Sequence, residues 1–487
     1  MTQQPHPQHQ FGQQPVYAPH DLMPNGRPRA GAVPLNQPSG GQHASPQHMP
    51  DWQQHPYQQA YDMPRMFDTR TRRASGLTGL RFPQPAVQHP QQAQPESAWA
   101  TQQRRIDHIH QERTPLPWTM IIGWAATGFL LIGLLGMFAL VAIQYGVAAT
   151  VVYGIFALGS LVTIMLTMLI ADRWHPMPLY VSLVAVLWGA VFAAAASMVV
   201  NTLSGIIAYD LTGDAAFANF VSAVISAPFI EELTKGLGVL AIFLVFRRHF
   251  NGPLDGLIIG ALVGGGFAFV ENITYYVRVA AEGGFQAAGV LIVLRGVIGI
   301  FGHCVYTSLT GMILGLVSRR FGVIAAVLSF LVAPLPGMAL HALWNLSAGL
   351  VSSLVHMVLL FGGELLLFAV WLTLIALLMV NESRMTRARL GEYANAGWLT
   401  HDEVAMLATW KGRREGRSWA RSIGAKKPMK RFIHEAAELA FTRQRLMANG
   451  GSPRALKDEQ DLLKRLHHNR GAMLAAASGG HYAVHPA

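Results

Sequence analysis

Residues 118–143 read WTMIIGWAATGFLLIGLLGMFALVAI, and this stretch contains no charged side chain. A helix needs about 20 apolar residues to cross a hydrocarbon layer about 30 Å thick, because each residue advances it by about 1.5 Å. The stretch therefore predicts a membrane-spanning helix. The whole chain agrees with this prediction, since only 13% of its 487 residues are charged, fewer than in an ordinary soluble globular protein.

Seven further apolar stretches of spanning length follow, so the sequence predicts an all-α polytopic membrane protein with about eight transmembrane helices. They cover 148–170, 177–200, 218–246, 254–277, 288–317, 322–350 and 354–380. Pro228 suits the first turn of a new helix, and Pro334 and Pro336 are expected to break the seventh stretch. Gly264, Gly265 and Gly266 permit a close backbone approach in the fifth.

The two ends of the chain differ from this membrane block. Residues 1–100 hold 18 Gln and 16 Pro without apolar periodicity, so they cannot bury enough surface to offset the entropy of ordering. We therefore expect a disordered Gln/Pro-rich cytoplasmic arm at 1–117, the membrane domain at 118–380 and a small, basic helical cytoplasmic domain at 381–487. In the last of these, Thr400 and Glu403 have the spacing of a capping box, and a second helix is expected over 428–447.

Basic residues in the short connections predict the orientation, because cytoplasmic loops retain Lys and Arg. Arginines follow the second, fourth and sixth stretches, none follows the first, third or seventh, and Arg278 alone departs from the pattern. Both termini are thus expected on the cytoplasmic side of the plasma membrane. The net charge of +11 lies mainly in the ends, which favours contact with the lipid bilayer over nucleic acid.

Ionisable groups inside the apolar stretches are few and clustered, although each costs at least ~2.5 kcal/mol to insert. Glu231 and Lys235 are four residues apart and can pair on one helix face, while Glu232 points about 100° away and is free for another partner. We interpret Glu364 as a partner for Arg295 or as a buried protonated acid. The remaining polar groups of the cluster are Glu271, Asn272, His303, His341 and Asn345.

These side chains are the ingredients for activating water, and two arrangements remain open. In one, a carboxylate of the fourth stretch serves as the base for peptide hydrolysis. In the other, Glu271, His303 and His341 bind a divalent metal, zinc before others, that activates water with a carboxylate assisting. The single cysteine, Cys304, allows no disulfide within the chain, and we expect it to be a buried packing residue rather than a nucleophile.

The motifs that carry these groups resemble the PrsW family of intramembrane proteases, which is related to the CAAX prenyl endopeptidases and the bacterial Abi proteins. The matching motifs, in order on successive stretches, are Glu231-Glu232-Leu233-Thr234-Lys235, Phe267-Ala268-Phe269-Val270-Glu271-Asn272, His303 and His341-Ala342-Leu343-Trp344-Asn345. Glu271 stands where the CAAX branch has a histidine, and Lys235 comes one residue before the arginine of that branch. Both features match PrsW.

The resemblance covers about 118–380 and implies a protease, of metalloprotease type, that cuts membrane-anchored protein substrates. In the best-known bacterial role the substrate is an anti-sigma factor. By resemblance, Glu231 would be the water-activating glutamate, with Glu232 and Lys235 beside it in the catalytic group. Asn345 would hold the carbonyl oxygen, and Glu271, His303 and His341 would be the remaining catalytic or metal-ligand positions.

Two other functions use the same features. A proton-coupled membrane transporter also needs buried carboxylates and broken helices. A family member that has lost catalysis would keep the fold and bind membrane partners.

Overall fold

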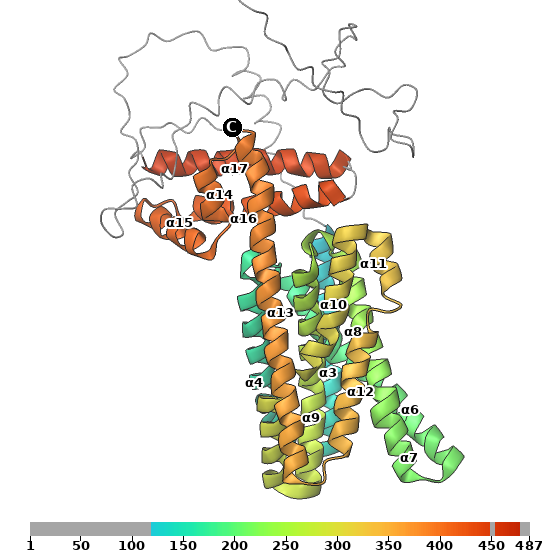
Figure 1. The fold of residues 1–487 in the computed structure, drawn as a ribbon. Coiled ribbons are helices and arrows are strands. Elements are labelled where there is room, and N and C mark those ends of the chain that lie inside the picture. Colours follow the sequence, from blue (N-terminus) through green and yellow to red (C-terminus); the bar gives the residue numbers. More distant parts are fainter. Residues whose placement is uncertain (1–117, 449–452, 478–487) are drawn as a thin grey trace, which may run out of the picture. The chain divides into compact units, whose positions relative to one another are not determined.

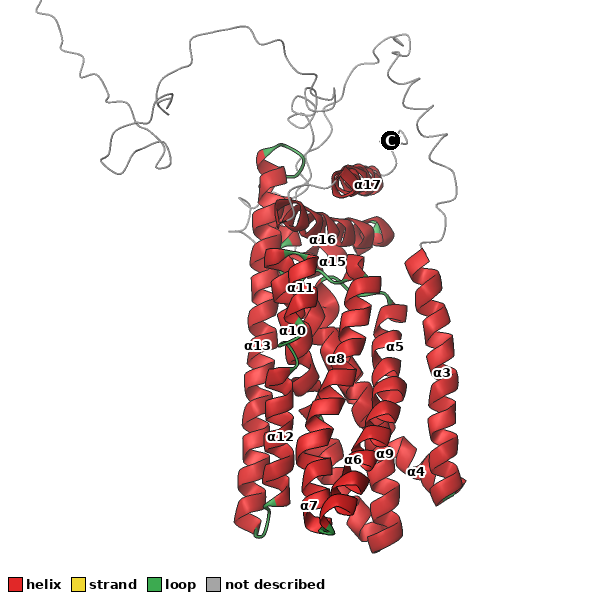
Figure 2. Ribbon diagram, turned by 90° about the vertical axis from the view of Figure 1, so that its right-hand side faces the viewer, coloured by secondary structure: helices red, strands yellow, loops and turns green. Residues whose placement is uncertain are grey.

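The computed structural model describes residues 118–448 and 453–477, and every regular element in these ranges is helical (Figure 2). The predicted N-terminal arm, 1–117, lies outside the described residues. The all-α class is confirmed for the part of the chain that the structure describes.

The membrane block consists of helices α3 to α13 (Figure 1). Its α-helices are α3 (Trp118–Tyr145), α4 (Val147–Ala171), α5 (Leu179–Leu187), α6 (Ala194–Thr212), α7 (Ala215–Phe220), α8 (Ala227–Val245), α9 (Pro253–Val293), α10 (Gly302–Phe321), α11 (Val323–Ser329), α12 (Leu335–Gly349) and α13 (Leu354–Asn395). Wider π-helical turns join some of them: η4 (Trp188–Ala193), η5 (Val221–Ser226) and η7 (Leu294–Ile298). Turns of this kind occur frequently at functional sites.

Five helical segments of the described chain are long and apolar enough to cross a membrane: Trp118–Tyr145, Val147–Trp174, Leu179–Thr212, Pro253–Phe321 and Leu354–Asn395. The fourth of them has 69 residues, enough for two crossings, and Gly284 interrupts it with a φ of 75°. The predicted fourth and seventh stretches are not among the five. Three charged side chains lie in α8, and the seventh stretch is divided into α11 and α12. A membrane protein is confirmed, and the count of eight crossings stays a prediction.

Pro228 and Pro336 each lie in the first turn of an α-helix, as expected. Pro228 lies in the first turn of α8, directly after the π-helical turn η5. Residues 330–334 form turns between α11 and α12 instead of a regular α-helix, and Pro336 lies in the first turn of α12. The expected new N-terminus at Pro228 is wrong, because α7, η5 and α8 follow one another without a break in helical backbone geometry. His341 lies about two turns into α12.

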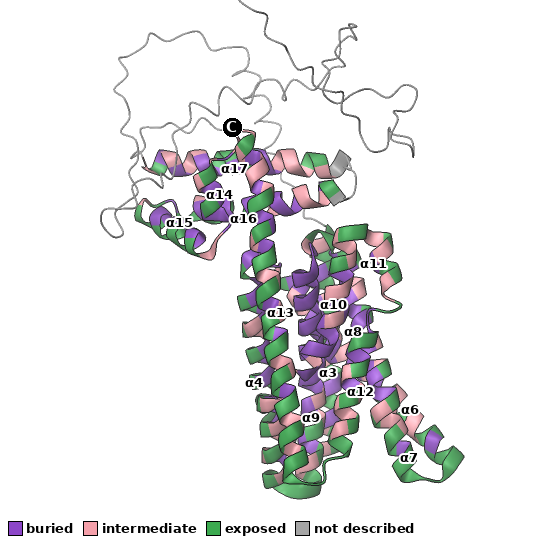
Figure 3. Ribbon diagram, viewed as in Figure 1, coloured by how far each residue is buried: buried purple, intermediate pink, exposed green. Residues whose placement is uncertain are grey.

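Helix α9 is the centre of the bundle, and its glycines bring α10 against it. Gly256, Gly260 and Gly264 recur every four residues, and a Cβ atom on each would lie 2.0, 2.6 and 2.3 Å from carbonyl oxygens of α10. Small residues at this spacing let two membrane helices approach closely. Helix α9 runs unbroken through Gly264, so this glycine provides close packing rather than a break. Figure 3 shows buried residues in the interior of the bundle, and a further group of them on the C-terminal helices.

The C-terminal region forms its own helical core from the end of α13 and from α14 (His401–Leu407), α15 (Trp410–Ser422), α16 (Lys426–Ala448) and α17 (Pro453–Ala477). The predicted capping box is confirmed, because the Glu403 N–H donates to Thr400 Oγ1 at 3.1 Å and the Thr400 N–H donates to Glu403 Oε2 at 2.8 Å. Helix α16 confirms the helix predicted over 428–447. Helices α15 and α17 were not predicted.

Hydrogen bonds join this core to loops of the membrane block. Arg413 donates through Nη1 to the Trp174 carbonyl at 2.7 Å, and its guanidinium lies 3.8 Å from the centre of the Trp174 ring. Arg445 donates to Asn251 Oδ1. The loops after α4 and α8 are therefore both held by basic residues of the C-terminal helices.

Candidate functional site

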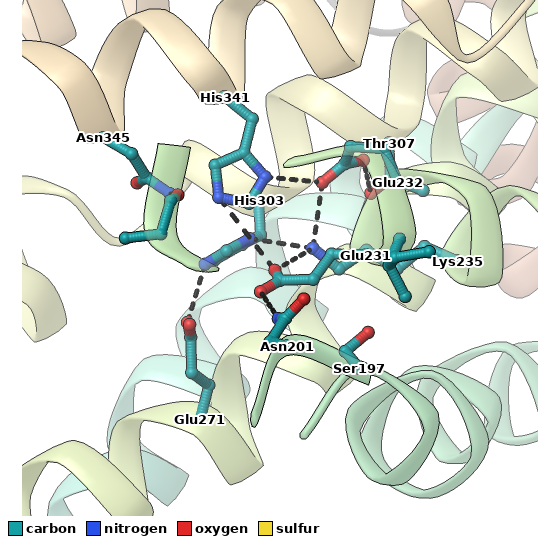
Figure 4. A network of polar contacts seen from close by, with 12 residues as sticks. Ser197, Asn201, Glu231, Glu232, Lys235, Glu271, His303, Thr307, His341 and Asn345 are labelled. Atoms are coloured by element: carbon teal, nitrogen blue, oxygen red, sulfur yellow. Dashed lines mark hydrogen bonds and ion pairs between the residues drawn. The ribbon is translucent and has the colours of Figure 1, made fainter. Parts of the chain in front are cut away.

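Four helices bring the polar groups together inside the bundle (Figure 4). Helix α8 carries Glu231, Glu232 and Lys235, and α9 carries Glu271. Helices α10 and α12 each contribute an imidazole, from His303 and His341. The structure brings these groups together, as expected, and hydrogen bonds connect them in one network.

Lys235 is the centre of the network and is fully buried. Its ammonium lies 3.2 Å from Glu231 Oε2, 2.9 Å from Glu232 Oε1 and 3.0 Å from His303 Nδ1. It also lies 3.6 Å from the centre of the Phe267 ring, an arrangement that favours the cation. The predicted Glu231–Lys235 pair is confirmed. Glu232 has other partners, as expected, but it also pairs with Lys235, because the long lysine side chain reaches carboxylates both three and four residues before it.

Glu232 has no exposed surface, and its two oxygens are fully used. Thr307 donates to Oε2 at 2.8 Å, and Oε1 lies 3.2 Å from His341 Nδ1. A carboxylate accepts only, so Nδ1 of His341 carries the proton and Nε2 is left with a free lone pair. That nitrogen lies 4.0 Å from Glu231 Oε2. Glu232 therefore orients His341.

Glu271 orients the second imidazole in the same way. Its Oε2 accepts a hydrogen bond from His303 Nε2 at 2.8 Å and one from Arg295 Nη2. Arg295 also donates through Nε to Asn272 Oδ1 at 3.0 Å. The predicted pairing of Arg295 with Glu364 is wrong, because the Arg295 guanidinium contacts Glu271 and Asn272 of α9 while Glu364 lies on α13.

Glu231 faces both imidazoles. Ligand atoms of Glu231, His303 and His341 all lie within 4.8 Å of one another. Among the described residues, no other histidines, cysteines and carboxylates form a group of three or more that could hold a metal ion. Two imidazoles and one carboxylate are a typical zinc donor set. His303 Nδ1 accepts from the Lys235 ammonium and Nε2 is hydrogen-bonded to Glu271, so these residues fit a divalent metal once Lys235 has released Nδ1. The sequence prediction had Glu271 in this set, whereas Glu231 occupies that place in the geometry.

Two predicted residues lie at the edge of the network or outside it. Asn345 donates through Nδ2 to the Ala223 carbonyl at 2.8 Å and so ties α12 to η5. Cys304 is fully buried, with its sulfur packed near Gly265 of α9, as expected of a packing residue.

Several contacts were not predicted from the sequence. Asn201 of α6 donates to Glu231 Oε1 at 3.3 Å, and Ser226 donates to Asn201 Oδ1 at 2.8 Å. Asn201 lies one residue past the predicted third stretch. The Tyr306 ring stacks on His341 with 5.2 Å between ring centres. Thr307 and Tyr306 carry no charge, and only their spacing of four and three residues from His303 places them near it.

A helical membrane bundle that buries this arrangement of glutamates and histidines fits the class of intramembrane hydrolases. Comparison with family models makes the class specific, because residues 177–379 match the PrsW-protease family, described as PrsW family intramembrane metalloprotease. The match confirms the resemblance over this segment of the chain. It begins just before α5 and ends within α13, so it contains every residue of the network. No curated protein and no solved structure matches the chain.

Proposed function

We propose that this protein is an endopeptidase of the plasma membrane, with cytoplasmic termini, that hydrolyses peptide bonds of membrane-anchored proteins. Its proposed substrate is an anti-sigma factor. The observation that supports the proposal most strongly is the group formed by Glu231, His303 and His341, whose ligand atoms lie within 4.8 Å of one another inside an apolar bundle.

Glu231, His303 and His341 are proposed to hold a zinc ion, with His303 binding through Nδ1 after the Lys235 ammonium has released that nitrogen. When bound, a zinc ion makes coordinated water more acidic and polarises the substrate carbonyl. Glu271 is hydrogen-bonded to His303 and Glu232 is hydrogen-bonded to His341. Each carboxylate therefore fixes the orientation and the tautomer of one ring. This is the second layer of contacts that metal-binding histidines usually have.

The chain's own groups also supply proton and charge positions. In the alternative without a metal, Glu231 Oε2, 4.0 Å from His341 Nε2, is the oxygen proposed to accept a proton from the attacking water. The Lys235 ammonium, 3.2 Å from that oxygen, compensates its charge. Asn345 is proposed to contact the substrate carbonyl, which would take over the amide that now donates to Ala223.

Cleavage by the purified, reconstituted protein tests this function. The substrate is a single-span reporter whose membrane segment comes from a membrane-anchored anti-sigma factor. Wild-type protein should cleave it, and Glu231→Gln or His341→Ala should abolish cleavage. Glu282→Gln, at an exposed ion pair with Arg278, is the matched control and should cleave normally. Cleavage retained in both site variants would refute the proposal, and pH-driven solute uptake without hydrolysis would favour a transporter.

A further inference from the structure

Helices α12 and α13 run side by side (Figures 1 and 2) and enclose an open groove of about 610 Å³. Its walls are mainly apolar and include Leu343 and Trp344 of α12 and Leu360 and Leu367 of α13. A groove of this composition within the membrane block suits an occupant that is itself mostly apolar.

One carboxyl group lies in these apolar walls. Glu364 of α13 lines the groove and is only 7% exposed. It forms no hydrogen bond or ion pair with any residue that the structure describes. Its carboxyl oxygens are not among the buried atoms that lack a partner, so they reach the surface of the groove. A polar group without a partner is costly in an apolar environment, so Glu364 is available to a donor that the occupant brings.

The groove borders the polar network. A Cβ atom on Gly302, the residue before His303, would lie 3.1 Å from Glu364 Oε1 and 3.6 Å from the Tyr306 hydroxyl. Tyr306 lines the groove as well, and its ring stacks on His341. Glu364 therefore lies beside the helix start that carries His303.

We propose that the groove binds the substrate's membrane segment next to the cleaved bond, and that Glu364 accepts a backbone N–H where that segment is unwound. The inference rests on the proposed function. A peptide bond can enter the site only if its helix opens, and opening leaves N–H groups without partners in a medium that offers none. A lipid chain would fill the apolar walls but would bring no donor to Glu364, so the unpartnered carboxyl favours a peptide.

Binding is measured without cleavage by using full-length protein that carries Glu231→Gln, reconstituted in phosphatidylcholine and phosphatidylglycerol vesicles. The probe is a fluorescent Leu/Ala peptide of about 22 residues with a central Gly-Gly pair, which loosens its helix. A matched peptide has Ala-Ala instead, and a third has one central lysine. The Gly-Gly peptide should bind about 2- to 10-fold more tightly than the Ala-Ala peptide, the worth of one hydrogen bond.

Two substitutions at position 364 separate the possible roles of the carboxyl. Glu364→Leu should remove the preference for the Gly-Gly peptide, whereas Glu364→Gln should retain it because an amide carbonyl still accepts an N–H. If Glu364 served as a counter-ion, the lysine peptide would bind best and Glu364→Gln would lose that binding. That result would overturn the proposal, as would an unchanged preference in Glu364→Leu.

Two neighbouring glycines of α13 give a matched pair for the groove itself. Gly363 lines the groove and Gly362 does not, and an added Cβ meets no other atom within 4 Å at either position. Gly363→Leu should fill the groove and abolish binding of all three peptides, while Gly362→Leu should bind them as before. Equal binding by both variants would overturn the proposal. If the groove variants behave as expected but protein with an intact Glu231 leaves the bound peptide uncut, the proposed function fails and the groove assignment stands.

Discussion

The ammonium nitrogen of Lys235 on α8 lies 3.0 Å from Nδ1 of His303 on α10. Lysine can only donate, so Nδ1 accepts and the proton of the imidazole is on Nε2, which faces Glu271. One contact between two helices thus sets the tautomer of a site histidine. Lys235 also compensates the charges of Glu231 and Glu232, with which it forms ion pairs.

Replacing Lys235 by methionine should destabilise the protein strongly. The substitution keeps most of the side-chain volume but leaves two buried carboxylates without their cation, and breaking a buried pair costs about 3–5 kcal/mol. Thermal unfolding in detergent measures the loss. The matched control is Arg278→Met, which breaks an ion pair whose side chains are 59% and 65% exposed and should have little effect. Equal stability of the two variants would contradict the central role of Lys235.

The close packing of α9 on α10 makes Gly264 a sensitive position. A Cβ atom there would lie 2.3 Å from the His303 carbonyl oxygen, which is backbone and cannot rotate away. Gly264→Ala should therefore displace His303 and lower stability by about 1–3 kcal/mol, as overpacking typically does. Gly289→Ala in the same helix is the control, since nothing lies within 4 Å of its Cβ position. The two variants have the same change in helix propensity, so a difference in melting temperature reports the contact alone.

Acid should weaken the junction between the C-terminal helices and the membrane block. His175, in the loop after α4, is buried and stacks on His434 of α16 with 5.3 Å between ring centres. Burial, and then the neighbouring His434 and His249, lower the pKa of His175 to about 3. His175 therefore binds a proton near pH 6.5 in the unfolded chain but only near pH 3 in the folded protein. Stability is lost as the pH falls from 6.5 towards 3.

At pH 5 this difference amounts to about 2 kcal/mol. The measurement is the melting temperature of full-length protein at pH 7.5 and pH 5.0. His175→Gln should be less stable at pH 7.5 but should lose less on acidification than wild type. The same pH dependence in both proteins would show that His175 is not the titrating group. His249, whose pKa is lowered to about 4 by burial and by Arg248, is the group to replace next.

Hydropathy and helix signals were sufficient to predict the helical membrane block, the capping box at Thr400 and the residues that meet in the site. They could not predict which groups pair inside it. Arg295 contacts Glu271 instead of Glu364, and it lies in a π-helical turn, which has no simple sequence signature. Likewise, whether Glu231 or Glu271 faces both imidazoles depends on how α8, α9 and α10 are placed, and only the close contact of α9 with α10 could be read from glycines.

Zinc binding by two glutamine variants decides between the two carboxylates. If Glu231 is the ligand and Glu271 only orients His303, Glu231→Gln should remove stoichiometric zinc. Glu271→Gln should then keep zinc but bind it about 10- to 100-fold more weakly, the usual effect of losing an orienting contact. The measurements are zinc content after purification and competition with a chelator, with Glu282→Gln as the control for a change of charge. The opposite order would restore the ligand set predicted from the sequence, because a direct ligand contributes more to affinity than the group that orients it. Full zinc affinity in both variants would mean that neither carboxylate holds the metal, and Glu231 would then be left with the role of base.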